Sequence, residues 1–506
     1  MARPFRWAVV RAVAALVCGA VLSLTLPPFD LLPALAAYSG LAALAAAGDR
    51  WARRRIAHRA LLGAAFGFGY HVAGLWWIGE AFLVDAAQFG ALIPLAVVGL
   101  PLALAPFHAV AVALAGLAPP GFARRTVALA VALALTEWVR GFAFTGFPWN
   151  VPAVQISSIP ALVQPVALVG VAGMAPLAIL LGAVPALVVA RSWRLSGAVL
   201  MAAIAAIVYG EMRLTQDAIP LANARIRIVQ PSIPQREKWD PDERNSIWAT
   251  LLRLTAEVSE AGARPSVVVW PETALPFLWS TPSLEQMQLS RALGPGAVLV
   301  TGAVEIEATN AGRRATNSIL VIDDRGEVTD RYDKAHLVPF GEYVPFAGVL
   351  TRIGLGALAA GTDTFVPGDP RDVLEVPGLP PARPRICYEA IFPHQPGHAP
   401  AGWILNLTND AWFGDTPGPY QHFRHVVLRS IEAGLPTVRV ANTGLSGTID
   451  AYGRVKDEIL LSRLAFRDIS LSESVSTLYA RFGYAPFLLV VTLLLAWVAL
   501  GRRSGV

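Results

Sequence analysis

Eight long apolar runs divide this sequence and limit the folds that are open to it. Each has roughly the ~20 residues that a helix needs to cross a hydrocarbon core of ~30 Å. Hydrophobic residues make up 55% of the chain and charged residues 15%, which is too little charge to cover a soluble protein of this length. We therefore predict a membrane protein with about eight transmembrane helices, near residues 7–26, 30–47, 60–79, 90–117, 126–144, 160–190, 195–211 and 485–501.

The first run, WAVVRAVAALVCGAVLSLTL, has the length of a signal peptide. It lacks a small-residue cleavage site, and the second apolar run follows it at once. We therefore expect a retained transmembrane helix and not a cleaved leader.

Arginine residues gather in alternate loops of this pattern. The loops between them, LPPFDLLP and EAFLVDAAQFG, contain neither Lys nor Arg. Because positive charge stays on the cytoplasmic side of a membrane, we predict that both termini are cytoplasmic and that residues 222–480 lie outside the cytoplasm. This orientation requires an even number of spans. The arginines are Arg3, Arg6, Arg50, Arg53, Arg54, Arg55, Arg59, Arg124, Arg125, Arg191, Arg194, Arg502 and Arg503.

The composition changes along the chain and predicts three parts. Residues 1–215 form a transmembrane domain of seven helices, and residues 484–506 hold the last helix and a short cytoplasmic tail. Residues 222–480 have ordinary globular composition with alternating strands, turns and helices, and are enough to bury a core of their own. Membrane topology explains the arginines behind the net charge of +5, so we expect no nucleic-acid partner.

The chain has only two cysteines, Cys18 and Cys387. Outside the cytoplasm, paired cysteines tend to oxidise to disulfides, but Cys18 lies in the first span and cannot reach the middle domain. An unpaired thiol there is a candidate reactive group. A small buried apolar side chain is an equally open interpretation of Cys387.

Three stretches of the middle domain place polar residues where strands end. In SVVVWPETALP (266–276), Glu272 follows a buried β-branched strand. In NSILVIDDRGEVTDRYDKAHLVPFGEYVP (317–345), two strands lead into an irregular segment with Lys334 and Glu342. RICYEAIFP (385–393) puts Cys387 after a third strand, and AGWILNLTNDAWFG (401–414) adds a fourth.

These residue types suggest nucleophilic catalysis. A thiol attacks an acyl carbon as the thiolate, so it needs a base or a positive neighbour. Glu272 can take the proton, and Lys334 and the backbone N–H after the cysteine can stabilise the oxyanion. Glu389 can orient the lysine or carry a proton. Singly, Glu272 is also consistent with a helix N-terminal acid and Lys334 with a solvated surface charge.

The motifs WPETALP, YDKAHLVPFGEYVP and ICYEAIFP, in this order, resemble the Glu–Lys–Cys triad of the nitrilase, or carbon–nitrogen hydrolase, superfamily. With about seven spans before the domain and one after it, nearly the whole chain is similar to the apolipoprotein N-acyltransferase family. Four further stretches reinforce this resemblance: TGFPWN (145–150), QPSIPQREKW (230–239), NLTNDAWFG and ANTGLSGTID.

The resemblance implies a multi-span α-helical membrane domain and an extracytoplasmic α/β domain with an α-β-β-α sandwich. It implies transfer of a fatty acyl chain from the sn-1 position of phosphatidylethanolamine, through a cysteine thioester, to the N-terminal α-amino group of an S-diacylglyceryl-cysteine apolipoprotein. The implied partners are the phospholipid, the apolipoprotein and the bilayer, with no cofactor. The implied location is the bacterial inner membrane, with the catalytic domain in the periplasm, and we expect a monomer.

The resemblance also implies roles for single residues. Matched by motif, Glu272 is the general base, Lys334 the oxyanion stabiliser and Cys387 the nucleophile. Groups that support the site fall at Glu342, Glu389 and Tyr388. Aromatic residues that line or gate the site and bind substrate fall at Trp239, Trp412 and Trp149.

Other polar and aromatic residues receive structural interpretations. His336, His394 and the HFRH segment (422–425) are too scattered for a zinc site, so we expect surface or helix-face roles and no metal. Glu137 and Arg140 are three residues apart on a helix and should pair. Two aromatic, proline-rich loops, residues 275–282 and 339–350, are predicted to dip into the lipid interface.

Two alternatives remain at this point. A membrane-tethered amidase would use the same triad but resolve the thioester with water. A transporter or receptor would bind a ligand without turnover, but its spans should carry more midplane polar groups or broken helices. The spans here are mainly Ala, Leu and Val, which favours the acyltransferase.

Overall fold

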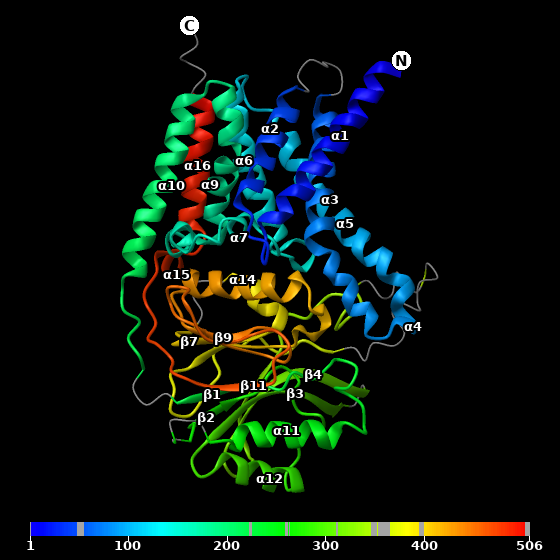
Figure 1. Ribbon diagram of the computed structural model, residues 1–506, viewed down its shortest axis with the longest axis vertical. Coiled ribbons are helices and arrows are strands. Elements are labelled where there is room, and N and C mark those ends of the chain that lie inside the picture. The colour runs from blue at the N-terminus through cyan, green and yellow to red at the C-terminus, as the bar shows by residue number, and fades with distance from the viewer. Residues whose placement is uncertain are drawn as a thin grey trace.

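The protein was analysed as a computed structural model, which describes residues 2–47, 55–221, 225–258, 264–309, 312–345, 365–393 and 399–500, together with residues 262 and 352. A helical bundle stands on an α/β body (Figure 1). Helix α1 (Ala2–Leu22) begins and helix α16 (Ala485–Leu500) ends at the end of the bundle that is far from this body. His394, residues 346–350 and the arginines at 50, 53, 54, 502 and 503 lie outside the described residues.

The bundle contains a helix for each predicted apolar run. The long helices are α1 (Ala2–Leu22), α3 (Arg55–Leu75), α5 (Ile93–Ala115), α6 (Phe122–Arg140), α9 (Val166–Val189) and α10 (Trp193–Leu214). The shorter ones are α2 (Ala37–Ala47), α4 (Ala86–Phe89), α7 (Pro152–Gln155), α8 (Pro160–Val163), α15 (Leu478–Phe482) and α16 (Ala485–Leu500).

Five segments of the described chain are long and apolar enough to cross a membrane: Trp7–Thr25, Ile56–Leu83, Ala86–Ala115, Val166–Val189 and Trp193–Leu214. Two shorter apolar segments, Leu32–Ala47 and Ala485–Leu500, match the predicted second and last runs. The predicted span at 126–144 corresponds to α6, which carries Glu137 and Arg140 in its last turn. These two residues pair with each other as predicted.

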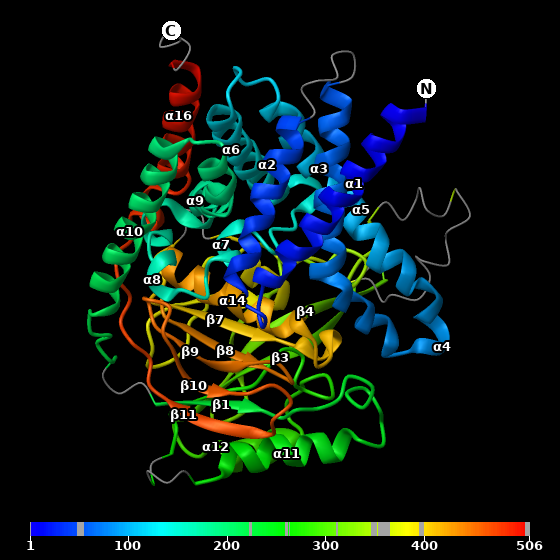
Figure 2. The same cartoon turned by 45° about the horizontal axis from the view of Figure 1, so that its top comes forward.

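Helix α9 is the most enclosed of the five segments, because 72% of its most apolar 18-residue stretch is buried, against 28% for the first span and for α10. Figure 2 shows α1 and α10 on the outside of the bundle. Their outward side chains are apolar and exposed, for example Val13 on α1 and Ile204 on α10. An exposed apolar surface of this kind fits a lipid surrounding.

The α/β body is built from two sheets. One has the strand order β11-β1-β2-β3-β4-β5 and the other β10-β9-β8-β7-β6. Strands β1 to β3 and β6 to β8 run parallel to their neighbours, and the outer strands pair antiparallel. The strands are β1 (Ile226–Gln230), β2 (Val267–Val269), β3 (Val298–Thr309), β4 (Gly312–Ile322), β5 (Val328–Asp333), β6 (Ala382–Ile386), β7 (Trp403–Thr408), β8 (Thr437–Ala441), β9 (Ser446–Ile449), β10 (Val455–Ile459) and β11 (Ala465–Ile469).

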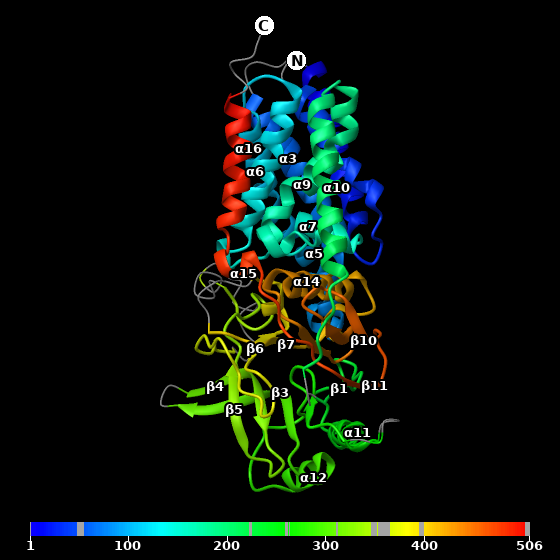
Figure 3. The same ribbon diagram turned by 90° about the vertical axis from the view of Figure 1, so that its left-hand side faces the viewer.

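The body has four layers (Figure 3). Alternate residues of both sheets, such as Val269 and Leu405, form one apolar core between them. Helices α11 (Arg244–Ala256) and α12 (Leu284–Leu293) cover the outer face of the first sheet. Helix α14 (Pro417–Ala433) covers the second sheet. This arrangement is the predicted α-β-β-α sandwich.

Helix α14 lies between the second sheet and the bundle (Figures 1 and 3). Phe423 and Val426 pack towards the sheet, in a cluster with Ile449. Leu428 and Ile431 belong to the core of the bundle. The helix is therefore buried on both sides, and it joins the α/β body to the bundle.

A close approach of backbones fixes helix α10 against the bundle. A Cβ at Gly210 would lie 1.9 Å from the carbonyl oxygen of Ala161, whereas one at Gly197 on the same helix would meet nothing within 4 Å.

We expect Gly210→Ala to lower the free energy of unfolding by about 1–3 kcal/mol because the added methyl group would overpack this contact. Gly197→Ala should cause no loss, because alanine favours a helix. Unfolding of both variants in detergent checks this, and equal stabilities would contradict the close contact.

Candidate active site

Three polar residues converge from strand ends of both sheets. Glu272 follows β2, Lys334 follows β5 and Cys387 follows β6. Cys387 has a positive φ of 47°, and Thr273, directly after Glu272, one of 45°. Such backbone conformations cost energy for residues other than glycine and gather at functional sites.

Lys334 connects the two carboxylates of the site. Its Nζ lies 2.8 Å from Oε1 of Glu342 and 3.6 Å from Oε1 of Glu272. The lysine is 1% exposed and Glu272 6% exposed, so these charges interact in a site with little water. The structure therefore brings Glu272, Lys334 and Glu342 together, and a solvated surface position for Lys334 is wrong.

Lys334 is held in its charged form. Burial alone would lower the pKa of its ammonium, but the carboxylates of Glu342 and Glu272 outweigh burial and raise it. A lysine with a raised pKa is a poor base at neutral pH and a good hydrogen-bond donor. Its chemistry fits stabilisation of an oxyanion.

The thiol of Cys387 is protonated at rest. Burial, followed by the Glu272 carboxylate, raises its pKa, and Lys334 only partly opposes this. Thr408 also opposes the rise in the pKa of this thiol. Because the thiolate is the nucleophile, the thiol proton has to leave as the sulfur attacks. Among the charged groups nearby, the Glu272 carboxylate has the largest effect on the pKa of this thiol.

Asn317, on β4, supports the same carboxylates. Its side-chain Nδ2 donates to Oε1 of Glu272 (2.8 Å) and to Oε1 of Glu342 (3.1 Å). Its backbone carbonyl oxygen accepts from the backbone N–H of Lys334 (2.8 Å). The sequence analysis did not identify this residue. The only available signal was its place at the start of the stretch NSILVIDDRG, in which the first of the two strands before Lys334 was predicted.

Glu389 anchors two catalytic segments together. Its Oε1 accepts from the backbone N–H groups of Ala335 (2.9 Å) and His336 (3.0 Å) and from the hydroxyl of Tyr332 (2.8 Å). Its Oε2 accepts from the backbone N–H of Ile386 (2.8 Å). Glu389 thus orients Lys334 through the backbone, and its four bonds leave it poorly suited to carry a proton.

A second buried lysine lies at the site and was not predicted. Lys238 is 4% exposed, and its Nζ donates to the carbonyl oxygen of Glu272 (2.9 Å). Burial lowers its pKa to about 8, although Glu272 and Cys387 act in the opposite direction. The sequence signal was weak, because Lys238 sits beside the tryptophan of the QREKW motif as an ordinary charged neighbour.

Behind the nucleophile lies a buried polar network. His422 contacts Oδ1 of Asp410 through Nδ1 (2.9 Å) and the carbonyl oxygen of Cys387 through Nε2 (3.2 Å). Arg439 donates to Oδ2 of Asp410 (2.6 Å). Burial would raise the pKa of Asp410, but Arg439 and His422 lower it to about 2. Of the predicted surface or helix-face roles of the HFRH segment, a surface role is wrong for His422. This residue lies on α14, is fully buried and contacts the backbone carbonyl of Cys387.

The membrane part holds the nucleophile loop from the other side. The hydroxyl of Tyr388 donates to the carbonyl oxygen of Gly146 (2.7 Å). Arg140 donates to the carbonyl oxygens of Phe147 and Trp149 (3.0 Å for the latter) and pairs with Glu137. A chain of contacts thus runs from α6, through the TGFPWN loop, to the residue after Cys387.

The three predicted substrate-binding tryptophans have different surroundings. Trp149 is 2% exposed, and its Nε1 donates to Oε1 of Gln421 (3.0 Å). Trp239 is 51% exposed and Trp412 41% exposed, so both can meet a ligand. Their contact with substrate stays a prediction, and for Trp149 the buried position indicates a role in joining the bundle to α14.

The two loops predicted to enter the lipid interface differ. In residues 275–282, Phe277 and Trp279 pack near Trp248 of α11, at the end of the body far from the bundle (Figure 1), so this prediction is wrong. In residues 339–345, Phe340 is 68% exposed, and the preceding Val338 packs in a cluster with bundle residues. The described part of this second loop therefore stays a candidate for contact with lipid.

Comparisons with known proteins cover both parts of the chain. The family model Apolipoprotein N-acyltransferase N-terminal domain matches residues 18–184, and the model Carbon-nitrogen hydrolase matches residues 225–458. The chain is similar to apolipoprotein N-acyltransferase of Brucella suis, with 43% identity over 96% of this chain and 94% of that protein. It is also similar to apolipoprotein N-acyltransferase of Rhodopseudomonas palustris, with 40% identity over 98% and 96%. Among solved structures, an amidase of the nitrilase superfamily from Nesterenkonia covers 51% of this chain and 94% of its own, at 18% identity and a TM-score of 0.33.

Lys238→Met removes the buried ammonium and keeps a side chain of similar length. The folded protein titrates this lysine at a pKa of about 8, whereas an unfolded chain titrates it at about 10.4. Between these pH values the unfolded state binds more protons, so the free energy of unfolding of the wild type should rise with pH. We expect the wild type to gain stability relative to Lys238→Met over this window, measured by chemical unfolding in detergent.

The control is Lys456→Met, which replaces an exposed lysine of β10. Its difference from the wild type should not depend on pH in this range. A constant difference for Lys238→Met as well would contradict a buried lysine that folds in its neutral form.

Proposed function

The chain belongs to the apolipoprotein N-acyltransferase family, acyltransferases of the carbon–nitrogen hydrolase superfamily, and we propose that Cys387 carries the acyl chain between two lipid substrates. The donor is a phospholipid, phosphatidylethanolamine at its sn-1 ester. The acceptor is the N-terminal α-amino group of an S-diacylglyceryl-cysteine apolipoprotein. The contact of Lys334 with both Glu272 and Glu342, beside the buried thiol, supports this proposal best.

In the first half-reaction, Glu272 takes the thiol proton as the sulfur of Cys387 attacks the ester carbonyl carbon. Lys334 and the backbone N–H of Tyr388 stabilise the oxyanion that forms. When the carbonyl re-forms, the ester C–O bond breaks, and the proton on Glu272 goes to the leaving alkoxide. The products are a thioester on Cys387 and a lysophospholipid.

In the second half-reaction, the neutral α-amino group of the acceptor attacks the thioester carbonyl. Glu272 takes a proton from the nitrogen, and the C–S bond breaks to form an amide. The proton returns to the sulfur, which restores the resting thiol. Cys387 and Tyr388 are 9% and 7% exposed, and this burial favours the amine over water as the group that resolves the thioester.

The membrane topology is part of the proposal. Eight spans, seven in residues 1–215 and one in residues 484–506, would place both termini in the cytoplasm and residues 222–480 in the periplasm. The start of α1 and the end of α16, both at the end of the bundle opposite the α/β body, support this arrangement (Figure 1). A bacterial inner membrane and a monomeric enzyme complete the proposal.

Incubation with phosphatidylethanolamine should add the mass of one acyl chain to the Cys387 peptide, and hydroxylamine should remove it. Cys387→Ala should form no adduct, and Cys18→Ala should form it fully. Glu272→Gln should slow adduct formation by about 10²–10⁴-fold through loss of the base, and Lys334→Met by about 10²–10³-fold through loss of the oxyanion donor. Mass spectrometry of the purified variants measures each of these rates, and an adduct on Cys387→Ala would refute the assignment of the nucleophile.

A diacylglyceryl peptide acceptor distinguishes transfer from hydrolysis. We expect an N-acylated peptide to form as the adduct on Cys387 disappears. Release of free fatty acid without amide would favour the membrane-tethered amidase that shares the triad.

Single cysteines in a Cys18→Ala, Cys387→Ala background test the topology. Asp217→Cys, between α10 and β1, should react with a membrane-impermeant maleimide in cells whose outer membrane has been permeabilised. Arg194→Cys, at the opposite end of α10, should react only after the inner membrane is broken. Both native residues are exposed in the structure, and the reverse labelling pattern would invert the proposed orientation.

A further inference from the structure

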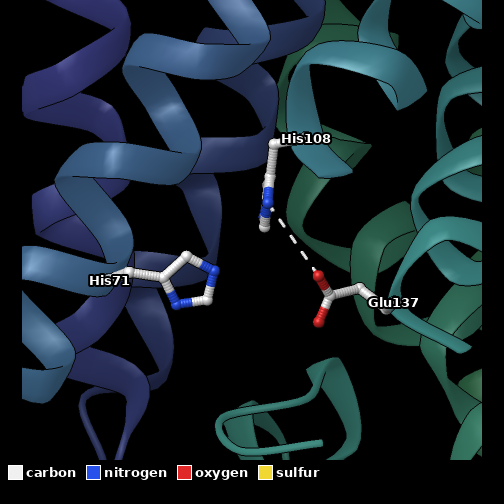
Figure 4. Close-up of side chains that lie close together, drawn as sticks. All are labelled: His71, His108 and Glu137. Carbon is white, nitrogen blue, oxygen red and sulfur yellow. Dashed lines mark ion pairs between the residues drawn. The ribbon is translucent and has the colours of Figure 1, made fainter. Parts of the chain in front are cut away.

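Three metal-ligating side chains meet inside the bundle, away from the triad (Figure 4). His71 comes from α3, His108 from α5 and Glu137 from α6. One ligand atom from each lies within 4.8 Å of the other two, and all three residues are buried. Among the residues that the structure describes, no other group of this kind is found.

His71 is the unusual member of this group. It is 0% exposed, and neither Nδ1 nor Nε2 has a hydrogen-bond partner. Buried polar atoms are almost always bonded, because leaving one without a partner costs about 1–3 kcal/mol. His108 Nδ1 is likewise buried without a hydrogen bond. Two neighbouring imidazoles with nitrogens that form no hydrogen bond could both bind one shared ligand.

The packing of α3 and α5 brings the two rings together. A Cβ at Gly63 would lie 2.3 Å from the carbonyl oxygen of His108, and one at Gly67 would lie 2.7 Å from the His108 ring. These glycines are four residues apart, a spacing that lets membrane helices approach closely. His71 follows after another four residues, so the same face of α3 presents it to His108, with ring centroids 5.3 Å apart.

Glu137 supplies a carboxylate to the same place. Its Oε1 lies 3.9 Å from Nδ1 of His108. Arg140 also contacts this carboxylate, through Nε at 3.1 Å from Oε1 and through a closer contact to Oε2. A carboxylate beside two imidazoles completes a set of three ligands that can bind one metal ion.

We propose that His71, His108 and Glu137 bind a divalent transition-metal ion, with zinc as the best match. Two imidazoles and one carboxylate are an established zinc ligand set, with metal–ligand bonds of about 2.0–2.2 Å. Ligands at that distance from a tetrahedral ion lie about 3.4 Å apart, so small side-chain rotations suffice to close the present spacing. The ion would cross-link α3, α5 and α6, and α6 carries the arginine that holds the TGFPWN loop at the nucleophile.

The charge of Arg140 sets a condition on this site. The ion adds positive charge where the carboxylate is already paired, in a region with little water. A hydroxide at the fourth position would offset one charge, and zinc-bound water ionises at about pH 7. We therefore expect binding to strengthen as the pH rises from about 6 to 8.

The test uses the full-length protein without a histidine tag, carrying Cys387→Ser so that the thiol cannot bind metal. After treatment with EDTA and its removal, zinc is titrated calorimetrically, and cobalt(II) is added separately to record its visible absorption. We expect one zinc per chain and a tetrahedral cobalt spectrum. His71→Phe should weaken zinc binding at least tenfold, because it removes a ligand but makes no change to the Glu137–Arg140 pair.

The matched control is His58→Phe, which lies on the same helix outside the cluster and should bind zinc like the parent. Circular dichroism and thermal unfolding confirm that the variants fold, and His71→Asn replaces His71→Phe if the larger ring is not tolerated. Absence of stoichiometric zinc binding in the parent would overturn the proposal. Equal zinc affinity in the parent and the His71 variant would also overturn it, because the metal would then be adventitious.

Discussion

An ammonium held between two carboxylates in a nearly dry pocket is the contact on which the rest of the catalytic site depends. Lys334 lies 2.8 Å from Glu342 and 3.6 Å from Glu272; Lys334 and Glu272 are buried, and the Glu342 side chain is 12% exposed. A buried charge costs free energy unless it is paired. Further hydrogen bonds hold the carboxylates and the lysine of these pairs in place. Asn317 binds both carboxylates, and Glu389 fixes the backbone beside the lysine. The division of labour follows from this, because the lysine stays charged while the thiol stays protonated until substrate arrives.

The bundle contributes to the site as well as to membrane insertion. Trp77 and Trp149 both donate to the side-chain oxygen of Gln421 on α14, at 3.2 and 3.0 Å. Tyr388, next to the nucleophile, packs in one buried cluster with Trp77 and Trp149. The loop after α6 therefore contacts both the membrane part and the catalytic part. The hydroxyl of Tyr388 links this loop to the residue that follows the nucleophile.

Much of the fold could be predicted from the sequence, because apolar length and β-branched runs are local signals. The apolar runs form helices, although α6 carries Glu137 and Arg140 in its last turn. The strands before Glu272 and Cys387 lie where their composition indicated. The triad residues could be named because each stands at a strand exit within a recognisable motif.

What the sequence could not show depends on contacts between distant segments. Lys238, Asn317 and Arg439 are ordinary polar residues until β1, β4 and β8 bring them to one place. The histidines of the HFRH segment, which lie on α14, were expected at a surface or on a helix face because they are too scattered for a zinc site. Here the bundle covers that face. The aromatic loop at 275–282 was assigned to lipid by composition alone, and composition does not show which end of a domain faces the membrane.

The burial of α14 on both sides has a practical consequence for anyone who wishes to dissect the enzyme. Cutting the α/β body away from the bundle would leave Leu428 and Ile431 facing water. It would also break the hydrogen bond that the backbone N–H of Val171 donates to Oε1 of Glu432 (2.9 Å). The α/β body therefore cannot be separated from the bundle at α14 without exposing apolar side chains and a buried carboxylate to water.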